Sequence, residues 1–268
     1  MTESSSRDLE AAASAYEDLH VPALFQVWVD RVLDLAEVSN GDRLLDLACG
    51  TGVLARAAVG RTRPNGTVVG IDPNPGMLAV ARRLEPSVDW REGIAEKLPA
   101  PDESFDVVVS QFGMMFFTDH TASLHEMVRV LVPGGRLAVV VWDALENSPA
   151  YSRVVSLLER QAGTLAADAL RAPFALGDVR NLETMFNTAG IESSHVITES
   201  RIARFPSVRV MVEAELRGWL PVMGVTLMEH EISDILIAAE EELVSFVQPN
   251  GEVVFDASAH IVLGRRPA

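Results

Sequence analysis

Short apolar segments alternate with amphipathic ones through the first half of the chain. Four short segments are five to seven residues long, rich in Val, Leu and Ile, and bounded by Gly, Pro or Asp: 44–48, 67–71, 105–109 and 136–142, with a weaker candidate at 88–91. Apolar residues at helical spacing fill the intervals at 53–59, 75–84 and 121–131. Strands that alternate with helices form parallel sheets covered on both faces, because each connection crosses over the sheet. The pattern predicts a doubly wound α/β fold.

The regions on either side of this core have weaker patterns. Residues 1–18 are polar and rich in Ala, which predicts a frayed or loosely docked helix, and 23–37 have the spacing of an amphipathic helix. Beyond residue 142 we expect helices at 148–161, 179–189, 207–219 and 229–247, and strands at 195–205 and 253–263 that pair antiparallel. No long linker divides the chain. We therefore expect one domain over 1–268, with a small helical cap formed by insertions at 144–177 and 207–249.

The composition is that of a folded protein and narrows its partners. Hydrophobic residues make up 48% of the 268 residues, and 22 Lys and Arg against 38 Asp and Glu give a net charge of −16. Such a charge repels phosphate backbones, so we expect no nucleic-acid partner. The single Cys, the scattered His residues and the lack of a signal peptide or a long apolar run predict no disulfide, no metal site, no membrane span and a cytoplasmic location.

The sharpest local motif joins the first predicted strand to the helix behind it. Gly50 and Gly52 allow a tight turn that a ligand can approach closely, and the free N–H groups of the following helix point toward that ligand. Twenty residues after Gly52, Asp72 ends the second predicted strand, where a carboxylate can accept hydrogen bonds from the two hydroxyls of a ribose. Together the two features predict a pocket for a nucleoside.

The glycine turn alone leaves two cofactor classes open. Gly50-x-Gly52-x-x-Ala55 also fits a dinucleotide site, so a nicotinamide or flavin enzyme is a rival interpretation. Asp46 argues against this rival, because a carboxylate in the strand repels a pyrophosphate and favours an ammonium group. The turn also lacks a third glycine, and residues 130–137 contain a Pro-Gly-Gly break that leads directly into a strand.

Four separated motifs carry a resemblance. They are Asp46-Leu-Ala-Cys-Gly-Thr-Gly52, Gly70-Ile-Asp72-Pro, Phe105-Asp106-Val-Val-Val and Arg129-Val-Leu-Val-Pro-Gly-Gly135. In order and spacing, over 20–142, the chain resembles class I S-adenosylmethionine-dependent methyltransferases, and most of all the small-molecule group that includes the ubiquinone and menaquinone biosynthesis enzymes. The resemblance implies a Rossmann-like sheet of seven strands, six parallel and one antiparallel, with 20–142 as the core that binds S-adenosylmethionine.

The resemblance also implies which residues bind the cofactor. They are Asp46, Ala48, Gly50, Thr51 and Gly52 around the methionine part, Asp72 at the ribose, Pro73 and Met77 beside the adenine, Gly93, Ile94 and Ala95 at the adenine edge, and Ser110, Gln111 and Phe112 facing the methionine amine and the methyl group. Ile94 departs from the family, whose members usually have an Asp there that accepts from the adenine amino group. Losing that bond costs about 0.5–1.5 kcal/mol, which weakens binding without abolishing it.

Apolar side chains beyond the fourth strand indicate an acceptor site. Ligands of open α/β sheets bind at the carboxyl ends of strands, so we expect Met114, Met115, Phe116 and Trp142 to line a pocket for an apolar or aromatic molecule. A methyl group on a sulfonium is already activated, so in-line positioning does much of the catalytic work without a metal or a triad. The catalytic residues stay unknown, with His120 as a candidate base and Asp143 as a candidate for orienting the acceptor.

These features predict S-adenosylmethionine-dependent methyl transfer, by in-line displacement, to a small organic acceptor. One alternative is a nicotinamide-dependent oxidoreductase. The other is a relative that binds the cofactor without transferring its methyl group, which the Ile94 departure keeps open. The acceptor, its reacting atom and the oligomeric state are not set by the sequence.

Overall fold

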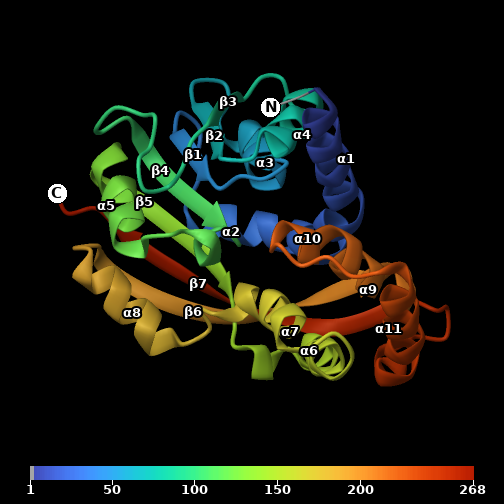
Figure 1. Ribbon diagram of the computed structural model, residues 1–268. Helices are drawn as coiled ribbons and strands as arrows, with labels where there is room; N and C mark the ends of the chain where they lie inside the picture. The colour runs from blue at the N-terminus through green and yellow to red at the C-terminus, as the bar shows by residue number, and fades with distance from the viewer. Residues whose placement is uncertain (1–2) are drawn as a thin grey trace.

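Seven strands form one mixed sheet in the computed structural model, which describes residues 3–268 apart from the side chains of residues 3–6, 192 and 193 (Figure 1). The strand order is β3-β2-β1-β4-β5-β7-β6, with bounds β1 Arg43–Leu47, β2 Thr67–Asp72, β3 Asp89–Glu92, β4 Phe105–Gln111, β5 Leu131–Trp142, β6 Glu192–Phe205 and β7 Val253–Arg265. β7 runs antiparallel to both of its neighbours, and the other pairs are parallel. The predicted sheet of six parallel strands and one antiparallel strand is confirmed.

Helices cover both faces of the sheet. α2 (Val29–Leu35), α3 (Val53–Thr62) and α4 (Pro75–Leu84) bury apolar residues against one face, and α5 (His120–Val130) and α8 (Val179–Thr188) do so against the other (Figure 1). β1 supplies both cores, because successive side chains of a strand point to opposite faces. Leu44 packs in the first core, and Leu45 and Leu47 pack in the second. The sheet is therefore doubly wound, as the sequence predicts.

The N-terminal segment is more firmly packed than its composition predicts. α1 (Glu3–His20) lies along α4, and a Cβ added to Gly76 at the start of α4 would be 2.5 Å from the backbone of Leu9. The expected loose docking is therefore wrong. The helix expected at 23–37 is shorter, because a π-helical turn Val21–Phe25 and a 3₁₀ turn Gln26–Trp28 precede α2. Pro22 lacks an N–H to donate, which favours such an irregular entry.

The two segments expected as insertions form a single group of helices. We call this group the helical cap; it comprises α6 (Pro149–Gln161), α7 (Thr164–Arg171), α9 (Val208–Ala214), the π-helical turn Glu215–Trp219, α10 (Leu220–Val222) and α11 (Glu229–Glu242). α6 contacts α7 and α11, and α11 contacts α9 (Figure 1). The sequence pattern does not predict α7, and the single helix expected at 207–219 changes to the π-helical turn at Glu215. No helix within residues 3–268 is both long and apolar enough to cross a membrane.

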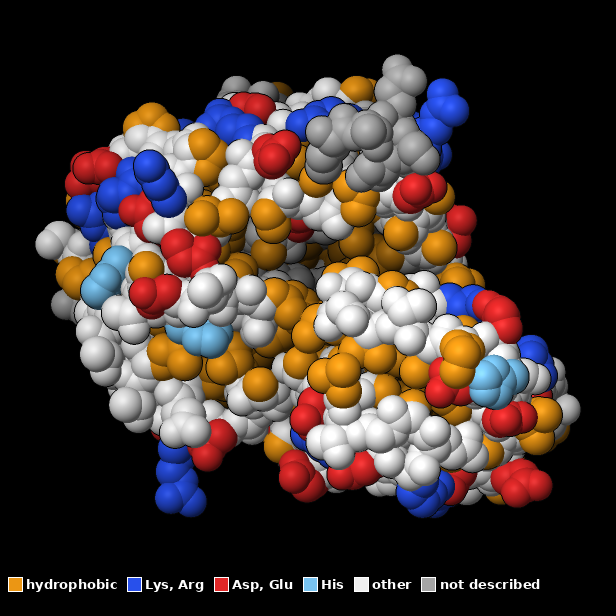
Figure 2. Space-filling view, viewed as in Figure 1, with side chains coloured by type: hydrophobic (Ala, Val, Ile, Leu, Met, Phe, Trp, Pro, Cys, Tyr) orange, Lys and Arg blue, Asp and Glu red, His pale blue; other side chains and the backbone are white. Residues whose placement is uncertain are grey.

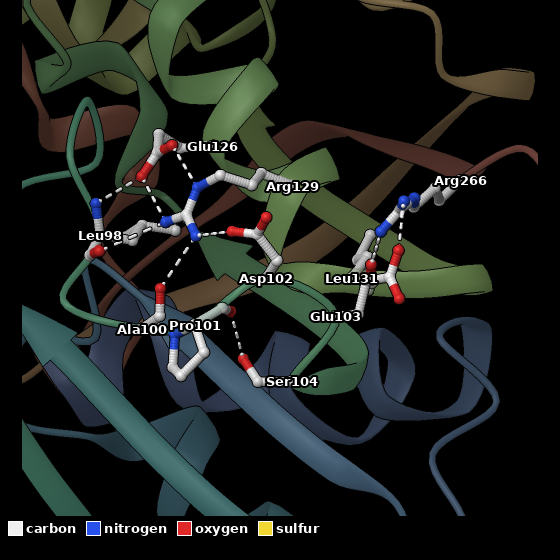
Figure 3. Close-up of polar contacts among 10 residues, drawn as sticks. All are labelled: Leu98, Ala100, Pro101, Asp102, Glu103, Ser104, Glu126, Arg129, Leu131 and Arg266. Carbon is white, nitrogen blue, oxygen red and sulfur yellow. Dashed lines mark hydrogen bonds and ion pairs between the residues drawn. The ribbon is translucent and has the colours of Figure 1, made fainter.

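An arginine ties the loop after β3 to α5 (Figure 3). Arg129 donates to both carboxylate oxygens of Glu126, at 2.6 and 2.7 Å, and to Asp102 Oδ1 at 2.7 Å. Glu126 Oε2 also accepts from the backbone N–H of Leu98 at 2.7 Å. These bonds fix the far end of the loop whose first residues, 93–96, face the cavity described below. The arginine that opens the fourth sequence motif thus supports the site from outside it.

Candidate active site

A cavity of about 1110 Å³ lies at the carboxyl ends of β1, β2, β4 and β5. α1 forms one wall and the helical cap another, and Figure 2 shows the opening as a hollow between two lobes with hydrophobic side chains around it. Ligands of open α/β sheets bind in this position. The predicted cofactor residues that line the cavity are Asp46, Ala48, Gly50, Thr51, Asp72, Pro73, Met77, Gly93, Ile94, Ala95, Gln111 and Phe112.

The turn after β1 has an unusual backbone. Ala48 has a φ of 55°, and Gly50 and Gly52 have φ values of 55° and 84°. The left-handed conformation is unfavourable for Ala, and such strain gathers at binding sites. Gly52 has a second requirement, because a Cβ there would lie 2.2 Å from the indole of Trp90. Gly52 does not line the cavity, so it shapes the turn from behind.

Asp46 is a buried carboxylate beneath this turn. It is 2% exposed, and its Oδ2 accepts from the backbone N–H of Ala55 at 2.9 Å in the first turn of α3. Burial raises the pKa of Asp46 to about 8, the Ala55 bond opposes the rise, and the charge of Asp72 adds to it. Burial also raises the pKa of the Tyr16 phenol, and the charges of both aspartates act in the same direction. A positively charged ligand group here would stabilise the ionised form of Asp46.

Asp72 is held at the end of β2 by backbone donors. Its Oδ2 accepts from the N–H of Gly50 and its Oδ1 from the N–H of Asn74, both at 2.8 Å. Burial raises the pKa of Asp72, and these two bonds oppose the rise. Each carboxylate oxygen keeps a second lone pair, so the side chain can still accept from a pair of hydroxyls. Because Asp72 bonds the glycine turn directly, the two sequence features form one structure.

Three buried polar atoms near the turn have no hydrogen-bond partner within the described part of the chain. They are Thr51 Oγ1, Ser110 Oγ and Gln111 Oε1. The amide nitrogen of Gln111 donates to the carbonyl of Phe25, at 3.2 Å. Buried polar groups are nearly always bonded, so unpartnered oxygens beside a cavity fit a ligand with hydrogen-bond donors. Thr51 and Gln111 line the cavity, whereas Ser110 does not.

The residues predicted to meet the adenine edge, 93–95, line the cavity. Ile94 is 51% exposed and lines the cavity, so an Asp at this position would have room to reach a ligand. Nearby, Glu96 Oε1 accepts from the N–H of Thr118 at 2.6 Å and of Asp119 at 3.2 Å. That carboxylate is therefore engaged with the loop before α5. Glu96 nevertheless lines the cavity, so it is the carboxylate closest in sequence to Ile94 that could face a ligand there.

Aromatic side chains form the remainder of the wall. The rings of Phe112 and Trp142 stack with their centroids 3.8 Å apart, and Phe25 lies 5.4 and 6.0 Å from them. On the cap side of the cavity, the rings of Phe116 and Trp219 are in contact, with 5.2 Å between their centroids. Of the four residues expected around the acceptor, Met115, Phe116 and Trp142 line the cavity.

Three of the residues predicted for the acceptor site and for catalysis lie away from the cavity. Met114 is fully buried in the opposite core with Leu124 and Met127, because the 3₁₀ turn Met114–Phe116 points it across the sheet. His120 Nε2 lies 3.1 Å from the carbonyl of Met114. Neither of these residues lines the cavity, so the structure does not place them against an acceptor.

Asp143 is also displaced, because neighbouring groups already use its carboxylate. Its Oδ1 accepts from the N–H of Ala144 at 2.7 Å and from Asn147 at 3.0 Å, and lies 3.1 Å from His260 Nε2. Its Oδ2 accepts from the hydroxyl of Ser258 at 2.8 Å. Asp143 does not line the cavity, so its geometry indicates a structural carboxylate and gives no support to a role in orienting an acceptor.

A polar cluster that the sequence analysis does not predict lines the cavity opposite the sheet. Tyr151 of α6 donates to Glu215 Oε1 at 2.9 Å, and His20 Nε2 at the end of α1 lies 3.5 Å from the same oxygen. Tyr16 stacks on His20 with 5.6 Å between ring centroids. The only local signal is the four-residue spacing of Tyr16 and His20, which places both on one helix face. Among the described residues, no group of three or more His, Cys, Asp or Glu could hold a metal ion.

Sequence comparisons match this architecture. A family model described as a methyltransferase domain matches residues 45–139. The chain is 33% identical over 195 residues to the ubiquinone/menaquinone biosynthesis C-methyltransferase UbiE of Cronobacter sakazakii, covering 66% of this chain and 76% of that protein. It is 45% identical over 117 residues to the demethylmenaquinone methyltransferase of Thermus thermophilus, covering 42% of this chain and 53% of that protein.

Solved structures share the fold. The YcgJ protein of Bacillus subtilis aligns with a TM-score of 0.59 at 20% identity, covering 90% of this chain and 98% of that one. Phosphoethanolamine N-methyltransferase 2 of Haemonchus contortus, solved with S-adenosyl-L-methionine, aligns with a TM-score of 0.60 at 16% identity, covering 97% and 57%. The comparisons give no support to an oxidoreductase or to a relative without transfer activity. The chain belongs to the class I S-adenosylmethionine-dependent methyltransferases, and S-adenosylmethionine is its cofactor.

Proposed function

We propose that this enzyme transfers the methyl group to a small hydroxylated aromatic molecule bound between the sheet and the helical cap. The observation that carries the proposal is the apolar aromatic wall formed by Phe116, Trp142 and Trp219. Arg217 is the only Lys or Arg among the described residues that line the cavity. It already pairs with Glu213 and Glu229, at 2.8 and 2.7 Å. A phosphorylated or carboxylated acceptor would therefore find no free Lys or Arg within this part of the structure.

The cofactor fits the polar half of the cavity. Asp72 would hold the ribose hydroxyls, and the unpartnered oxygens of Thr51 and Gln111 would accept from the amino-acid end, near the negative charge of Asp46. Pro73 and Met77 would flank the adenine, and the 93–95 loop would meet its edge. When bound, S-adenosylmethionine supplies a methyl group already activated by a positively charged sulfur.

The chain then has to place an acceptor in line with that methyl group and exclude water. The stacked rings of Phe112 and Trp142 lie at the ends of β4 and β5, between the cofactor residues and the cap. The Phe112 backbone is held at a φ of 56°, a strained conformation that aims its ring. Positioning of this kind lowers the barrier by about 7–11 kcal/mol when the reacting atoms are well aligned.

The names of the relatives favour a quinol-type acceptor. The UbiE protein and the Thermus protein are named for ubiquinone and menaquinone biosynthesis, whose ring systems are apolar, aromatic when reduced, and hydroxylated. A cavity of about 1110 Å³ is large enough for the cofactor and such a ring together. Phosphoethanolamine, named for the Haemonchus neighbour, needs cationic partners that this wall does not offer.

A labelled-methyl assay tests the proposal. The full chain is incubated with S-adenosylmethionine carrying a labelled methyl group and with 1,4-naphthohydroquinone under anaerobic conditions, and in parallel with phosphoethanolamine. We expect label in the naphthohydroquinone product and none in the phosphoethanolamine sample. Label only in the second sample would refute the aromatic acceptor while leaving methyl transfer intact.

A further inference from the structure

The cluster of His20, Tyr151 and Glu215 lies outside the set of residues proposed to bind the cofactor. Its members come from α1, α6 and the π-helical turn of the cap, so three distant segments meet on an otherwise apolar wall. Glu215 is 4% exposed, and it lines the cavity. Burying a carboxylate is costly, and π-helical turns of this kind often occur at functional sites. The burial cost of this carboxylate, together with its place on the cavity wall, favours a chemical role for Glu215.

The hydrogen bonds leave one oxygen of Glu215 available. Oε1 accepts from Tyr151 and faces His20 Nε2, whereas Oε2 makes no hydrogen bond within the described part of the chain. His20 Nδ1 is buried without a partner there, so a proton on Nδ1 would be a buried donor with no acceptor. A proton on Nε2, by contrast, is directed at the carboxylate of Glu215. Burial and the charge of Glu215 raise the pKa of Tyr151, so the phenol stays protonated as a donor.

The cluster lies close to the cofactor residues. The Tyr16 ring stacks on His20, and a Cβ on Gly50 would be 3.9 Å from Tyr16 Cε1. One aromatic ring therefore separates His20 from the glycine turn. His120 and Asp143 do not line the cavity at all, whereas Glu215 does.

We propose that Glu215 is the catalytic base that removes a proton from the methyl acceptor, with His20 and Tyr151 as positioning residues that hold its other oxygen. The inference rests on the proposed function, because it requires an acceptor hydroxyl in the apolar part of the cavity. The hydroxyl proton passes to Glu215 Oε2. The electron pair released from the O–H bond forms the new bond from oxygen to the methyl carbon as the sulfur–carbon bond breaks and its electrons remain on sulfur. If a ring carbon attacks through the conjugated ring, the hydrogen on that carbon then leaves as a proton and the oxygen takes up a proton, which restores the aromatic hydroxyl.

A base at Glu215 requires an acceptor with an ionisable hydroxyl, such as an aromatic alcohol or a quinol. An acceptor that loses no proton, such as a thioether, would make no use of Glu215. A buried general base typically contributes about 10²–10⁴-fold to the rate, and the contribution shrinks as the acceptor becomes more acidic. That dependence on acidity separates a base from a residue that only supports the wall.

The test compares Glu215→Gln with the wild-type chain on two probes, 1,4-naphthohydroquinone and its more acidic 2-chloro derivative. The substitution keeps the shape of the side chain and the acceptor for Tyr151, and removes the proton-accepting charge. We expect kcat for the unsubstituted probe to fall by about a hundredfold or more, and for the chloro probe to fall clearly less. KM and the cofactor Kd should stay within about twofold, since no cofactor contact is lost. The matched control is Glu240→Gln, which changes a cap carboxylate that does not line the cavity and whose side chain is 56% exposed.

Two further variants address positioning. Tyr151→Phe and His20→Gln each keep the Glu215 carboxylate and remove one group beside Oε1. Each should lower kcat by about tenfold without changing KM. These two variants test the cluster even if the Glu215→Gln chain does not fold. Equal losses on both probes, or full activity of Glu215→Gln, would overturn the assignment of the base. No transfer by the wild-type chain to either probe would instead refute the proposed acceptor class, and the base with it.

Discussion

The two halves of the cavity are built in different ways. On the proposed cofactor side, Asp46 and Asp72 lie on two adjacent parallel strands, and their carboxylates accept from the backbone N–H groups of Ala55 and Gly50 in the turn between them. On the proposed acceptor side, His20, Tyr151 and Glu215 come from segments far apart in the chain and meet through side chains alone. The first arrangement follows from local sequence and serves a fixed ligand. The second depends on tertiary packing and can vary without disturbing the sheet.

The largest expected effect concerns the buried carboxylate of the cofactor side. An acid whose pKa is higher in the folded chain than in the unfolded one keeps its proton longer when folded, so the free energy of unfolding falls as the pH rises through that interval. For Asp46 the interval runs from 3.8 to about 8. The decline should approach about 1.4 kcal/mol per pH unit, and the raised pKa of Asp72 acts with the same sign.

Urea unfolding of the cofactor-free chain at pH 5, 6 and 7 measures this decline. Asp46→Asn removes the titrating group and keeps an oxygen for the Ala55 N–H, so its unfolding free energy should depend much less on pH. The same slope in both proteins would show that Asp46 is not the group responsible.

The next effect tests whether the cofactor side acts as one unit. Asp72→Ala removes the acceptor for the Gly50 N–H and the proposed acceptor for the ribose hydroxyls. Hydrogen bonds to a charged group contribute about 1.5–3 kcal/mol, so the cofactor Kd should rise by more than tenfold. Isothermal calorimetry with S-adenosylhomocysteine provides the measurement. Glu240→Gln, which changes an exposed carboxylate outside the cavity, is the control, and an unchanged Kd for Asp72→Ala would refute the ribose role.

A substitution on the proposed acceptor side should change acceptor binding and leave cofactor binding unchanged. Trp219 contacts Phe116 on the cap side of the cavity and donates from Nε1 to the carbonyl of Ala169 at 2.8 Å. Trp219→Ala removes apolar surface that a bound ring would cover, which is worth about 1–2 kcal/mol. KM for 1,4-naphthohydroquinone should rise by about tenfold while the cofactor Kd stays the same. If the cofactor Kd rises as much as KM, the two halves are not separable.

The same division explains what the sequence can predict. β1, β2, β4, the core of β5 and the glycine turn are predictable because each is specified by residues within a few positions of one another. The tight docking of α1, the π-helical turn at Glu215 and the displacement of Asp143 are not, because they depend on contacts between distant segments. Glu215 and His20 are 195 positions apart, and nothing near either residue signals the other.

Met114 shows why the sequence can identify the segment that lines a site and still assign the wrong side chain to it. It stands beside Met115 in the segment after β4, and both are apolar. The 3₁₀ turn directs Met115 to the cavity and Met114 to the opposite core. Composition identifies the segment, but only the backbone conformation decides which of the two side chains meets a ligand.

The smallest expected effect lies at Ile94, where the cofactor side departs from its family. Ile94 is 51% exposed at the cavity and carries no acceptor, and the nearby Glu96 has one carboxylate oxygen held by the backbone of residues 118 and 119. Ile94→Asp should restore an acceptor for the adenine amino group and lower the cofactor Kd by about three- to tenfold, equivalent to about 0.5–1.5 kcal/mol.

Ile94→Ala controls for loss of the apolar side chain, and S-adenosylinosine, which lacks the amino group, should gain nothing from the Asp. An equal gain for both nucleosides would mean that the substitution acts through the loop. A gain for the adenosine form alone would place the adenine amino group at residue 94, and would show that this half of the cavity accepts the family's residue without any change to the acceptor side.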